Sequence, residues 1–377
     1  MKTKFRIPAM LFMVAILCTL IVVSCKDDDN DTTPPSVDLT ALQASITAAQ
    51  TKLTSTTEGK ADGQYSADSR SALSAAITAA QAVAGNSATT QEEADNAKNS
   101  LDLAVTAYDD AVIKPIAAED LIAYWSFDEG TGTTVADGSG NSHNGEFKKG
   151  PDYGDWPQGL PEWGADRTGA AGKAIHFANG GNVEVPYSTA LNPTTAISVS
   201  AWVKLDKTKA GNRFLGLQSW IGYKFEVEDH NKPFFSLGHG DAGAAYDRDT
   251  EGTVLPEDNA DWHHLVVTFD SDADKMIFYI DGENVKEWTD TTDPAHVLDT
   301  PYNLTIGQDF PSDKYYLGDP GDGTNFGDPT LEDQYHVIPA AWGNYFEGSI
   351  DELRMYKIAL TESQVTALYD REKPDAN

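Results

Sequence analysis

The chain has 377 residues and carries 59 aspartates and glutamates against 27 lysines and arginines, which gives a formal net charge of −32 at pH 7. This negative field argues against nucleic acid and anionic lipid surfaces as partners, and it suits solubility and cation binding. Both cysteines, Cys18 and Cys25, lie near the N-terminus. The rest of the chain is therefore expected to hold no disulfide, and packing or a bound metal must stabilise it.

The first 24 residues have the pattern of a targeting segment. Basic residues precede an apolar stretch over residues 7–23, which is short for a transmembrane span and is followed closely by polar residues. The sequence V-V-S-C, which ends at Cys25, resembles a bacterial lipobox. This resemblance implies a lipoprotein signal peptide over residues 1–24 and a lipid anchor on Cys25. The alternative is an ordinary signal peptide with an incidental cysteine.

The residues after the cysteine point to a location. The run K-D-D-D resembles the acidic export signal of lipoproteins that reach the outer face of the outer membrane. The polar segment over residues 25–36 contains two adjacent prolines and is expected to be an extended, lipidated tether.

Residues 37–112 are rich in Ala, Thr, Ser, Gln and Leu, with apolar residues at helical spacing. Three such stripes, separated by glycine-containing polar loops, predict an antiparallel three-helix bundle. The motifs I-T-A-A-Q-T-K-L and A-I-T-A-A-Q-A-V resemble the FIVAR module of cell-surface proteins. Nothing in this segment combines residues that could perform chemistry, so a spacer role is expected. Residues 113–120 contain Pro115 and form the predicted hinge.

From residue 121 to residue 377 the sequence has the texture of a β domain. Short alternating stretches are separated by Gly, Asp and Asn turns, and they predict a two-sheet sandwich or jelly roll. The expected strands are 121–127, 174–177 paired with 183–185, 196–203, 262–269, 276–280 and 304–306. The dipeptide D-G at 281–282 favours a type I′ hairpin turn.

The stretch over residues 346–370 is expected to close this domain with a strand and a short helix. Strict alternation places Leu353 and Met355 on the same face as Asp351, and Ile350 on the opposite face. Thr361 followed by Gln364 predicts a capping box at the start of the helix.

Ordered motifs identify the family that the β domain resembles. They include Y-W-S-F-D-E-G-T-G, G-K-A-I-H-F, I-S-V-S-A-W-V, D-W-H-H-L-V-V-T-F-D and F-E-G-S-I-D-E-L-R-M-Y. In this order they resemble laminin G-like domains of the concanavalin A-like jelly-roll superfamily. The resemblance implies a mainly β chain whose two-sheet jelly roll follows a small three-helix bundle. This superfamily includes lectins, hydrolases, lyases and adhesion modules, so function needs its own evidence.

A structural calcium ion is the cofactor that this resemblance implies. The turn D-G-S-G-N at 137–141 offers hard oxygen ligands. In domains that look like this one, a calcium is often held between that turn and the aspartate of the closing I-D-E strand. The implied ligands are Asp137, Asn141 and Asp351. The alternative is a favourable turn sequence beside an aspartate that merely solvates a strand edge.

Three insertions, at residues 146–168, 236–260 and 310–345, are longer than a bare sandwich needs, and they are rich in aromatic residues. Aromatic rings pack against the C–H faces of sugars while nearby polar groups bind the hydroxyls. The predicted glycan contacts are Trp156, Trp163, Tyr246, Tyr315, Tyr316, Trp342 and Tyr345. The alternative is that several of these rings pack their own loops. Trp125, Trp202 and Trp262 lie in strand motifs and are expected in the core.

Catalytic patterns are weak in this sequence. Glucanases of the superfamily provide acids as E-x-D-x-E or E-x-D-x-x-E, but in F-E-V-E-D-H Glu228 takes the place of the aspartate and His230 that of the second glutamate. A lyase needs a Tyr and a His, and no ordered motif brings them together. No catalytic residue is therefore assigned.

The sequence predicts a cell-surface lipoprotein that binds polysaccharide without cleaving it and captures it for degradation and uptake, with a neighbouring glycan-uptake complex as a further partner. A glycoside hydrolase or polysaccharide lyase, and an adhesin that binds host or matrix protein, remain alternatives.

Overall fold

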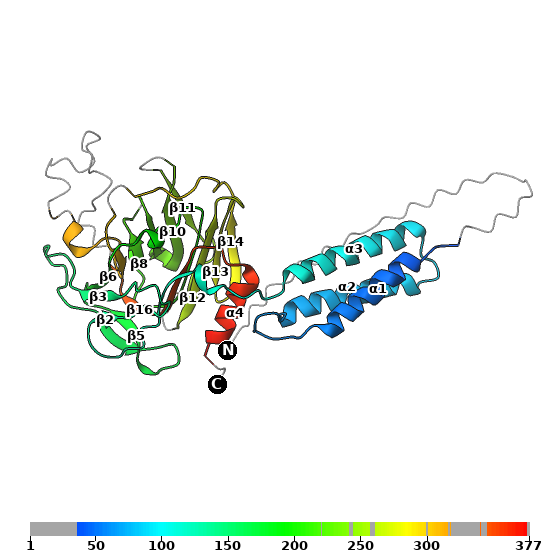
Figure 1. Ribbon diagram of the computed structural model, residues 1–377, viewed down its shortest axis with the longest axis horizontal. Coiled ribbons are helices and arrows are strands. Elements are labelled where there is room, and N and C mark those ends of the chain that lie inside the picture. The colour runs from blue at the N-terminus through cyan, green and yellow to red at the C-terminus, as the bar shows by residue number, and fades with distance from the viewer. Residues whose placement is uncertain are drawn as a thin grey trace, which may run out of the picture.

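The computed structural model describes residues 36–219, 221–240, 244–256, 261–298, 301–315, 317, 340 and 345–374. Three helices precede two antiparallel β-sheets packed as a sandwich (Figure 1). The predicted fold class is thereby confirmed. The predicted signal peptide, Cys25, Tyr316 and Trp342 lie outside the described residues. Within the described ranges, none of the helices combines the length and the hydropathy that a membrane span requires.

The helices are α1 (Thr40–Ser55), α2 (Ala67–Gly85) and α3 (Gln91–Asp110). They pack side by side around a shared apolar core that includes Leu42, Ile46, Leu73 and Leu101, all on the stripes seen in the sequence. Helix α3 begins with a capping box between Thr90 and Glu93. Helical periodicity and local capping thus account for this part of the chain.

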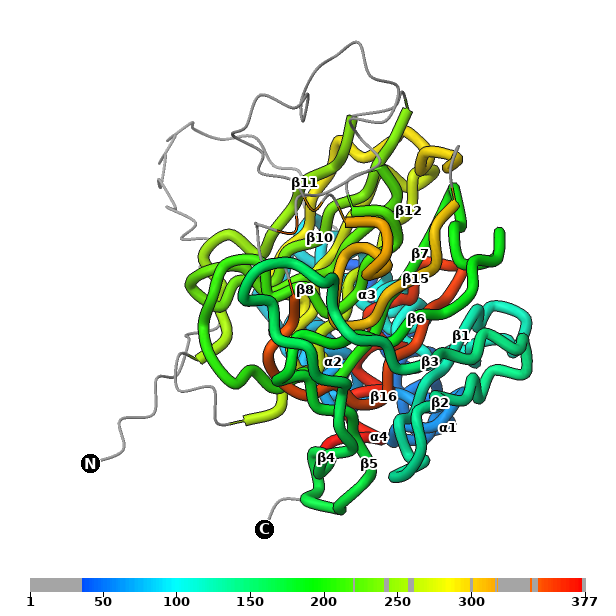
Figure 2. Tube along the Cα trace, turned by 90° about the vertical axis from the view of Figure 1, so that its left-hand side faces the viewer, coloured from blue at the N-terminus to red at the C-terminus, as the bar shows by residue number. Residues whose placement is uncertain are grey.

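The first sheet has the strand order β14-β13-β12-β7-β16-β5-β4, with β1 also paired to β16. Its strands are β1 (Leu121–Trp125), β4 (Glu162–Ala165), β5 (Ala171–Phe177), β7 (Ala196–Leu205), β12 (His263–Asp270), β13 (Lys275–Ile280), β14 (Glu283–Trp288) and β16 (Gly348–Tyr356). Figure 2 shows the β4–β5 hairpin extending at one edge of the domain.

The second sheet has the order β11-β10-β9-β8-β15-β6-β3-β2. Its strands are β2 (Thr134–Val135), β3 (Gly145–Lys148), β6 (Asn182–Val185), β8 (Asn212–Leu217), β9 (Tyr223–Glu228), β10 (Lys232–Gly238), β11 (Ala245–Asp249) and β15 (Leu304–Ile306). The core between the two sheets includes Trp125, Phe177, Phe225 and Leu265.

Two sequence expectations about the strands have opposite outcomes. The successive hairpins β12–β13 and β13–β14 form, and Asp281 (φ 52°) and Gly282 (φ 81°) both take the left-handed conformation of a type I′ turn.

The expected pairing of 174–177 with 183–185 is wrong. Strand β5 pairs with β4 and β16, whereas β6 pairs with β3 and β15 in the opposite sheet. The chain changes sheet at Gly180 (φ 70°), where an added Cβ would lie 2.6 Å from the Pro157 carbonyl oxygen.

Strand β16 departs from the strict alternation expected of it. A register shift between Asp351 and Arg354 coincides with a positive φ of 53° at Glu352. This irregularity changes the phase of the strand, so Ile350, Leu353 and Met355 all enter the core while Asp351 points outward. The expectation that Asp351 shares a face with Leu353 is therefore wrong.

Helix α4 (Glu362–Glu372) covers part of the outer face of the first sheet and lies between the sandwich and the helical bundle (Figure 1). The predicted capping box between Thr361 and Gln364 is present. The bundle contacts α4 directly, because Lys60 Nζ donates to the Asp370 carbonyl oxygen at 2.8 Å and Arg371 Nε donates to the Lys60 carbonyl oxygen at 2.8 Å.

Candidate glycan-binding site

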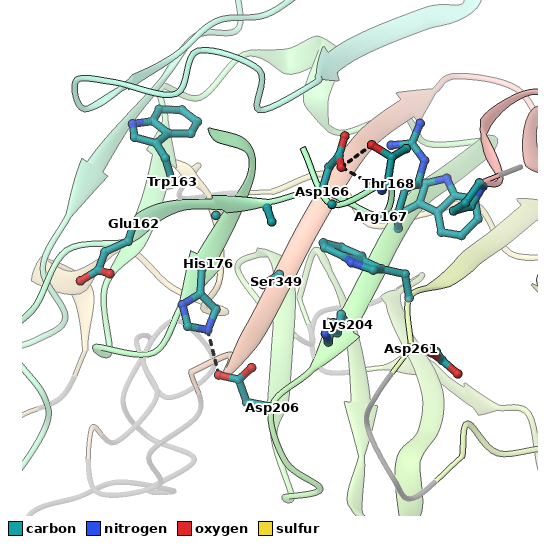
Figure 3. Close-up of a pocket in the computed structure, with 16 residues that line it drawn as sticks. Glu162, Trp163, Asp166, Arg167, Thr168, His176, Lys204, Asp206, Asp261 and Ser349 are labelled. Atoms are coloured by element: carbon teal, nitrogen blue, oxygen red, sulfur yellow. Dashed lines mark hydrogen bonds and ion pairs between the residues drawn. The ribbon is translucent and has the colours of Figure 1, made fainter. Parts of the chain in front are cut away.

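A hollow of about 810 Å³ lies on the outer face of the first sheet, beside the β4–β5 hairpin. Its floor is a row of side chains from adjacent strands. His176 on β5 lies opposite Glu162 on β4 and Ser349 on β16, and Ser349 lies opposite Lys204 on β7. Successive strand residues alternate between faces, so these polar groups point outward while their neighbours enter the core. Figure 3 shows this arrangement.

Tryptophans are among the residues that line the hollow beside the polar row. Trp163 on β4 is partly exposed, but it lies opposite the core residue Ile175, and its ring turns toward the inner face of the sheet. There it packs on Phe147 with a centroid distance of 5.2 Å, and its Nε1 donates to the Gly132 carbonyl oxygen at 2.9 Å. Trp262 is also partly exposed and lines the hollow immediately before β12. Figure 3 shows Trp163 and Asp261 on opposite sides of the hollow. The hollow therefore combines the partly exposed indole of Trp262 with hydrogen-bonding groups on rigid strands.

Two carboxylates of the hollow are held in defined hydrogen bonds. His176 Nε2 lies 2.9 Å from the Asp206 carboxylate, and this hydrogen bond raises the pKa of His176 above its usual value. Asp166 accepts hydrogen bonds from the backbone N–H groups of Thr168 and Ala170, each at 2.8 Å. Burial acts to raise the pKa of Asp166, but hydrogen bonds from Thr168 and Ala170 outweigh it and lower this pKa. Asp166 therefore stays ionised at neutral pH.

Arg167, at the tip of the β4–β5 hairpin, anchors this wall. Its guanidinium pairs with the Asp351 carboxylate, donates to the Glu372 carbonyl oxygen at 2.6 Å and lies 5.4 Å from the centroid of the Trp202 ring. Trp202 Nε1 donates to the Glu372 carboxylate at 2.9 Å. Burial raises the pKa of Asp351 to about 7, with a contribution from Glu352, while Arg167 opposes the rise.

The described glycan-contact candidates separate into different environments. Trp163 is the one among them that lines the hollow. Trp156 and Tyr315 are only 7% and 6% exposed and pack together with Tyr345, whose ring lies 4.9 Å from that of Trp156. Tyr246 is 5% exposed and stacks on His239 at 3.8 Å. These last four rings mainly pack their own loops.

Trp125 is fully buried in the core, as expected. Trp202 is 2% exposed but lies on the outer face of the first sheet, against Tyr369 of α4.

The residues expected to bind calcium have other partners. The Asp137 carboxylate accepts hydrogen bonds from the backbone N–H groups of Tyr124, Ser139 and His143 and from the Ser139 hydroxyl. Burial would raise the pKa of Asp137, but these bonds outweigh it and lower the pKa. Asn141 Nδ2 donates to the carbonyl oxygens of residues 121 and 122. Asp351 pairs with Arg167.

No group of three or more His, Cys, Asp or Glu side chains in the described part of the chain could hold a metal ion. The contacts of Asp137, Asn141 and Asp351 thus do not fit a shared calcium, which stays an untested prediction.

The acidic strand considered for catalysis is β9. Its Glu226 is buried and pairs with Arg213 at 2.7 Å and with Lys224 at 2.8 Å. Burial opposes ionisation, yet these two cations keep the pKa of Glu226 below its usual value. Glu228 pairs with Lys232 at 3.2 Å. Glu226 is thus held as an ion-paired anion, whereas burial raises the pKa of Glu228 above its usual value although Lys232 opposes the rise.

Two histidines of the β domain lie beside tyrosine rings: His239 stacks on Tyr246 with a centroid distance of 3.8 Å, and His264 stacks on Tyr369 at 6.1 Å. His230 is exposed, and His263 lies 2.8 Å from the Asp281 carboxylate. His264 is fully buried against Ser200, and burial lowers its pKa to about 3.

The polar residues of the hollow were not assigned from the sequence. The motifs A-W-V-K-L-D and G-K-A-I-H-F do indicate which residues point outward, because Lys204, Asp206 and His176 alternate with core residues. Their meeting in one place depends on strand pairings between distant segments.

Residues 177–323 match the family model Laminin_G_3, described as the concanavalin A-like lectin/glucanases superfamily. The predicted laminin G-like domain is confirmed for this segment. Lys204, Asp206, Asp261 and Trp262 fall within it, whereas Trp163 and His176 lie before it. The FIVAR-like module and the lipid anchor stay predictions.

Several solved structures are similar at the level of the fold. Domain 4 of AbnA, a GH43 extracellular arabinanase from Geobacillus stearothermophilus, solved with arabinotriose, is 22% identical with a TM-score of 0.44, over 66% of this chain and 98% of that one. The binding domain of Paraclostridial Mosquitocidal Protein 1 is 15% identical with a TM-score of 0.45, over 67% and 52%.

A third structure is of botulinum neurotoxin type C, a toxin whose cell entry depends on interaction with two ganglioside molecules. It is 13% identical with a TM-score of 0.42, over 67% of this chain and 52% of that one. The chain thus spans about half the length of both toxin structures. A comparison with curated protein sequences gave no significant match.

Proposed function

We propose that this protein is a non-catalytic, lipid-anchored cell-surface protein that captures polysaccharide in the hollow beside the β4–β5 hairpin. One observation carries the proposal: a hollow lined by Trp163 and by the partly exposed Trp262 lies over a row of outward polar side chains on four adjacent strands. The match of residues 177–323 to the concanavalin A-like lectin/glucanases superfamily supports it.

The chemistry of the hollow suits a sugar chain. A pyranose ring has an apolar face of C–H groups, which packs on an indole, and an edge of hydroxyls, which need donors and acceptors. Glu162, Asp206 and Asp261 provide acceptors, and Lys204 provides a donor. The volume of about 810 Å³ lies within the usual range of ligand pockets, roughly 300–1,000 Å³.

The N-terminal part of the proposal places this site at a cell surface. Lipid on Cys25 would anchor the chain in the outer membrane, and the tether and helical bundle would hold the β domain away from the bilayer. Contacts between the bundle and α4 support a fixed presentation of the hollow. A neighbouring uptake complex would then receive the captured glycan.

Affinity electrophoresis in native gels that contain single polysaccharides tests the proposal. The protein is expected to be retarded by at least one glycan, and Trp163→Ala and Trp262→Ala should each weaken this binding about tenfold or more, since each removes a ring face worth over 1 kcal/mol. Trp288→Ala is the matched control, because Trp288 lies on β14 at the opposite edge of the same sheet.

Three outcomes would contradict the proposal. Retardation that survives both hollow variants would place binding elsewhere. Release of reducing ends or unsaturated products would favour the enzyme alternative. Absence of retardation on every glycan would favour the adhesin.

A further inference from the structure

We infer that the hollow takes an uncharged polysaccharide and rejects glycans that carry carboxylate or sulfate groups. The inference rests on the proposed function and adds to it the chemical class of the ligand. Its basis is the sign and the availability of the charges that line the hollow.

Acidic side chains outnumber basic ones in the lining. Four carboxylates belong to it: Glu162, Asp166, Asp206 and Asp261. The basic residues are Arg167 and Lys204. His176 also lines the hollow and is positively charged only when it is protonated. A bound anion would therefore meet several like charges.

The cations of the lining are not equally available to a ligand. The Arg167 guanidinium pairs with Asp351 and also lies 3.8 Å from the Glu352 carboxylate, and its side chain is only 11% exposed. The His176 ring is hydrogen-bonded to Asp206, so its positive charge below its pKa is matched by a neighbouring negative one. Lys204 alone offers a half-buried ammonium group from the floor. Two of the carboxylates are also engaged, Asp206 with His176 and Asp166 with Thr168 and Ala170, so Glu162 and Asp261 are left against one ammonium group.

The same carboxylates suit an uncharged sugar chain. An ionised carboxylate only accepts hydrogen bonds, and its bonds to hydroxyl donors are stronger than those between neutral groups. Glu162 and Asp261 are exposed at opposite parts of the lining, so hydroxyls along one saccharide chain could reach both while a ring packs on Trp262. A carboxylate or sulfate in place of a hydroxyl would remove the donor and add repulsion.

The rest of the protein adds to this preference. Its formal net charge of −32 creates a negative field over the surface, which lowers the local concentration of polyanions and slows their approach. This long-range effect weakens with salt, since the screening length falls to about 8 Å at physiological ionic strength. Close contacts inside the hollow would be screened less.

A matched pair of ligands made from one polymer tests the inference. Biotinylated neutral polysaccharides, including galactomannan, xyloglucan, arabinan and mixed-linkage β-glucan, are immobilised, and binding of the full chain is measured by bio-layer interferometry. The neutral polymer that binds is then oxidised at its primary hydroxyls to carboxylates and measured again. Alginate and chondroitin sulfate serve as natural polyanions.

Binding to the oxidised polymer is expected to fall about tenfold or more, because added like charges meet the acidic lining. The double variant Glu162→Gln/Asp261→Asn should reduce the difference in binding between the neutral and the oxidised polymer. Undiminished binding to the oxidised polymer, or binding to alginate or chondroitin sulfate that Trp163→Ala abolishes, would overturn the inference and leave the proposed function standing. Lack of binding to every polymer would overturn the proposed function itself.

Discussion

The guanidinium of Arg167 and the carboxylate of Asp351 form a buried ion pair across 184 residues of sequence. The pair joins the tip of the β4–β5 hairpin to strand β16, and a second bond from Arg167 reaches the carbonyl oxygen of Glu372 at the end of α4. One side chain thus ties a wall of the hollow to the centre of the sheet and to the C-terminal helix. The irregular phase of β16 makes this possible, because it directs Asp351 outward.

Replacing Arg167 with alanine should lower the free energy of unfolding by about 3 kcal/mol, since it leaves Asp351 buried without its cation. The loss should be smaller at pH 5 than at pH 8, because a protonated Asp351 does not need the guanidinium. Urea unfolding at both pH values measures this. Lys173→Ala is the control; its ion pair with Asp128 is exposed and should contribute only about 0–1 kcal/mol. Equal losses in the two variants would contradict the prediction.

His176 should titrate above the usual histidine pKa because its ring is hydrogen-bonded to Asp206. A raised pKa in the folded state means that the pair stabilises the protein below the unfolded-state pKa, and that this stability is lost as the pH rises through the folded-state pKa. The contribution should be small, about 0.2–1 kcal/mol, because the pair is partly exposed.

Measuring the ring-proton shifts of His176 by NMR against pH checks this. Asp206→Asn should lower the midpoint, and an unchanged midpoint would mean that the hydrogen bond does not form in solution.

Trp156 and Trp163 should respond to alanine substitution in opposite ways. Trp156 is buried, donates to the Gly180 carbonyl oxygen at 2.8 Å and packs against Tyr345, so its removal should cost about 3–5 kcal/mol of stability. Glycan affinity of the folded fraction should change little. Trp163→Ala should cost less stability and most of the affinity. Thermal unfolding and glycan binding, measured on both variants, test this assignment. A large loss of affinity in Trp156→Ala together with the larger loss of stability in Trp163→Ala would contradict it.

The helical bundle and the β domain should tumble as one body. Besides the contacts of Lys60 and Arg371, Gln364 Nε2 donates to the Lys114 carbonyl oxygen at 3.2 Å. The variant Arg371→Ala/Gln364→Ala should cost about 1–3 kcal/mol in unfolding free energy, because Arg371 is exposed but Gln364 is buried and also completes the capping box with Thr361. NMR relaxation should nevertheless give the two parts different correlation times in the variant and a common one in the unaltered chain. Separate correlation times in the unaltered chain would contradict a fixed arrangement.

Patterns local in sequence predicted much of the fold. The stripes of α1 to α3, the Asp281-Gly282 turn and the capping box at Thr361 each depend on residues a few positions apart, and the structure confirms them. The pairing of β5 and β6 failed because two short alternating strands give no sign of which sheet each one joins. The bulge at Glu352 was missed because no glycine marks its left-handed conformation.

The site was harder to predict because it depends on tertiary packing and on the pairing of strands that are distant in sequence. Trp156 and Trp163 lie in one insertion with similar neighbours, and only tertiary packing buries the first while leaving the second at the rim of the hollow. His176, Ser349 and Lys204 become neighbours through the pairing of β5, β16 and β7. A strand pattern predicts that such residues point outward, but it does not predict what lies beside them.

The pairing of β1 with β16 also determines how the β domain would respond to a pull. A glycan held at β4 and β5, and a chain that continues N-terminally from β1 into the bundle, would place tension across β16, which pairs with both β5 and β1. Because β1 joins that sheet through β16 alone among the described strands, the β1–β16 hydrogen bonds would carry the load that passes through β1, in parallel with the contacts between the bundle and α4. The strength of these two connections together would set the drag that a captured polymer could exert before the domain opens.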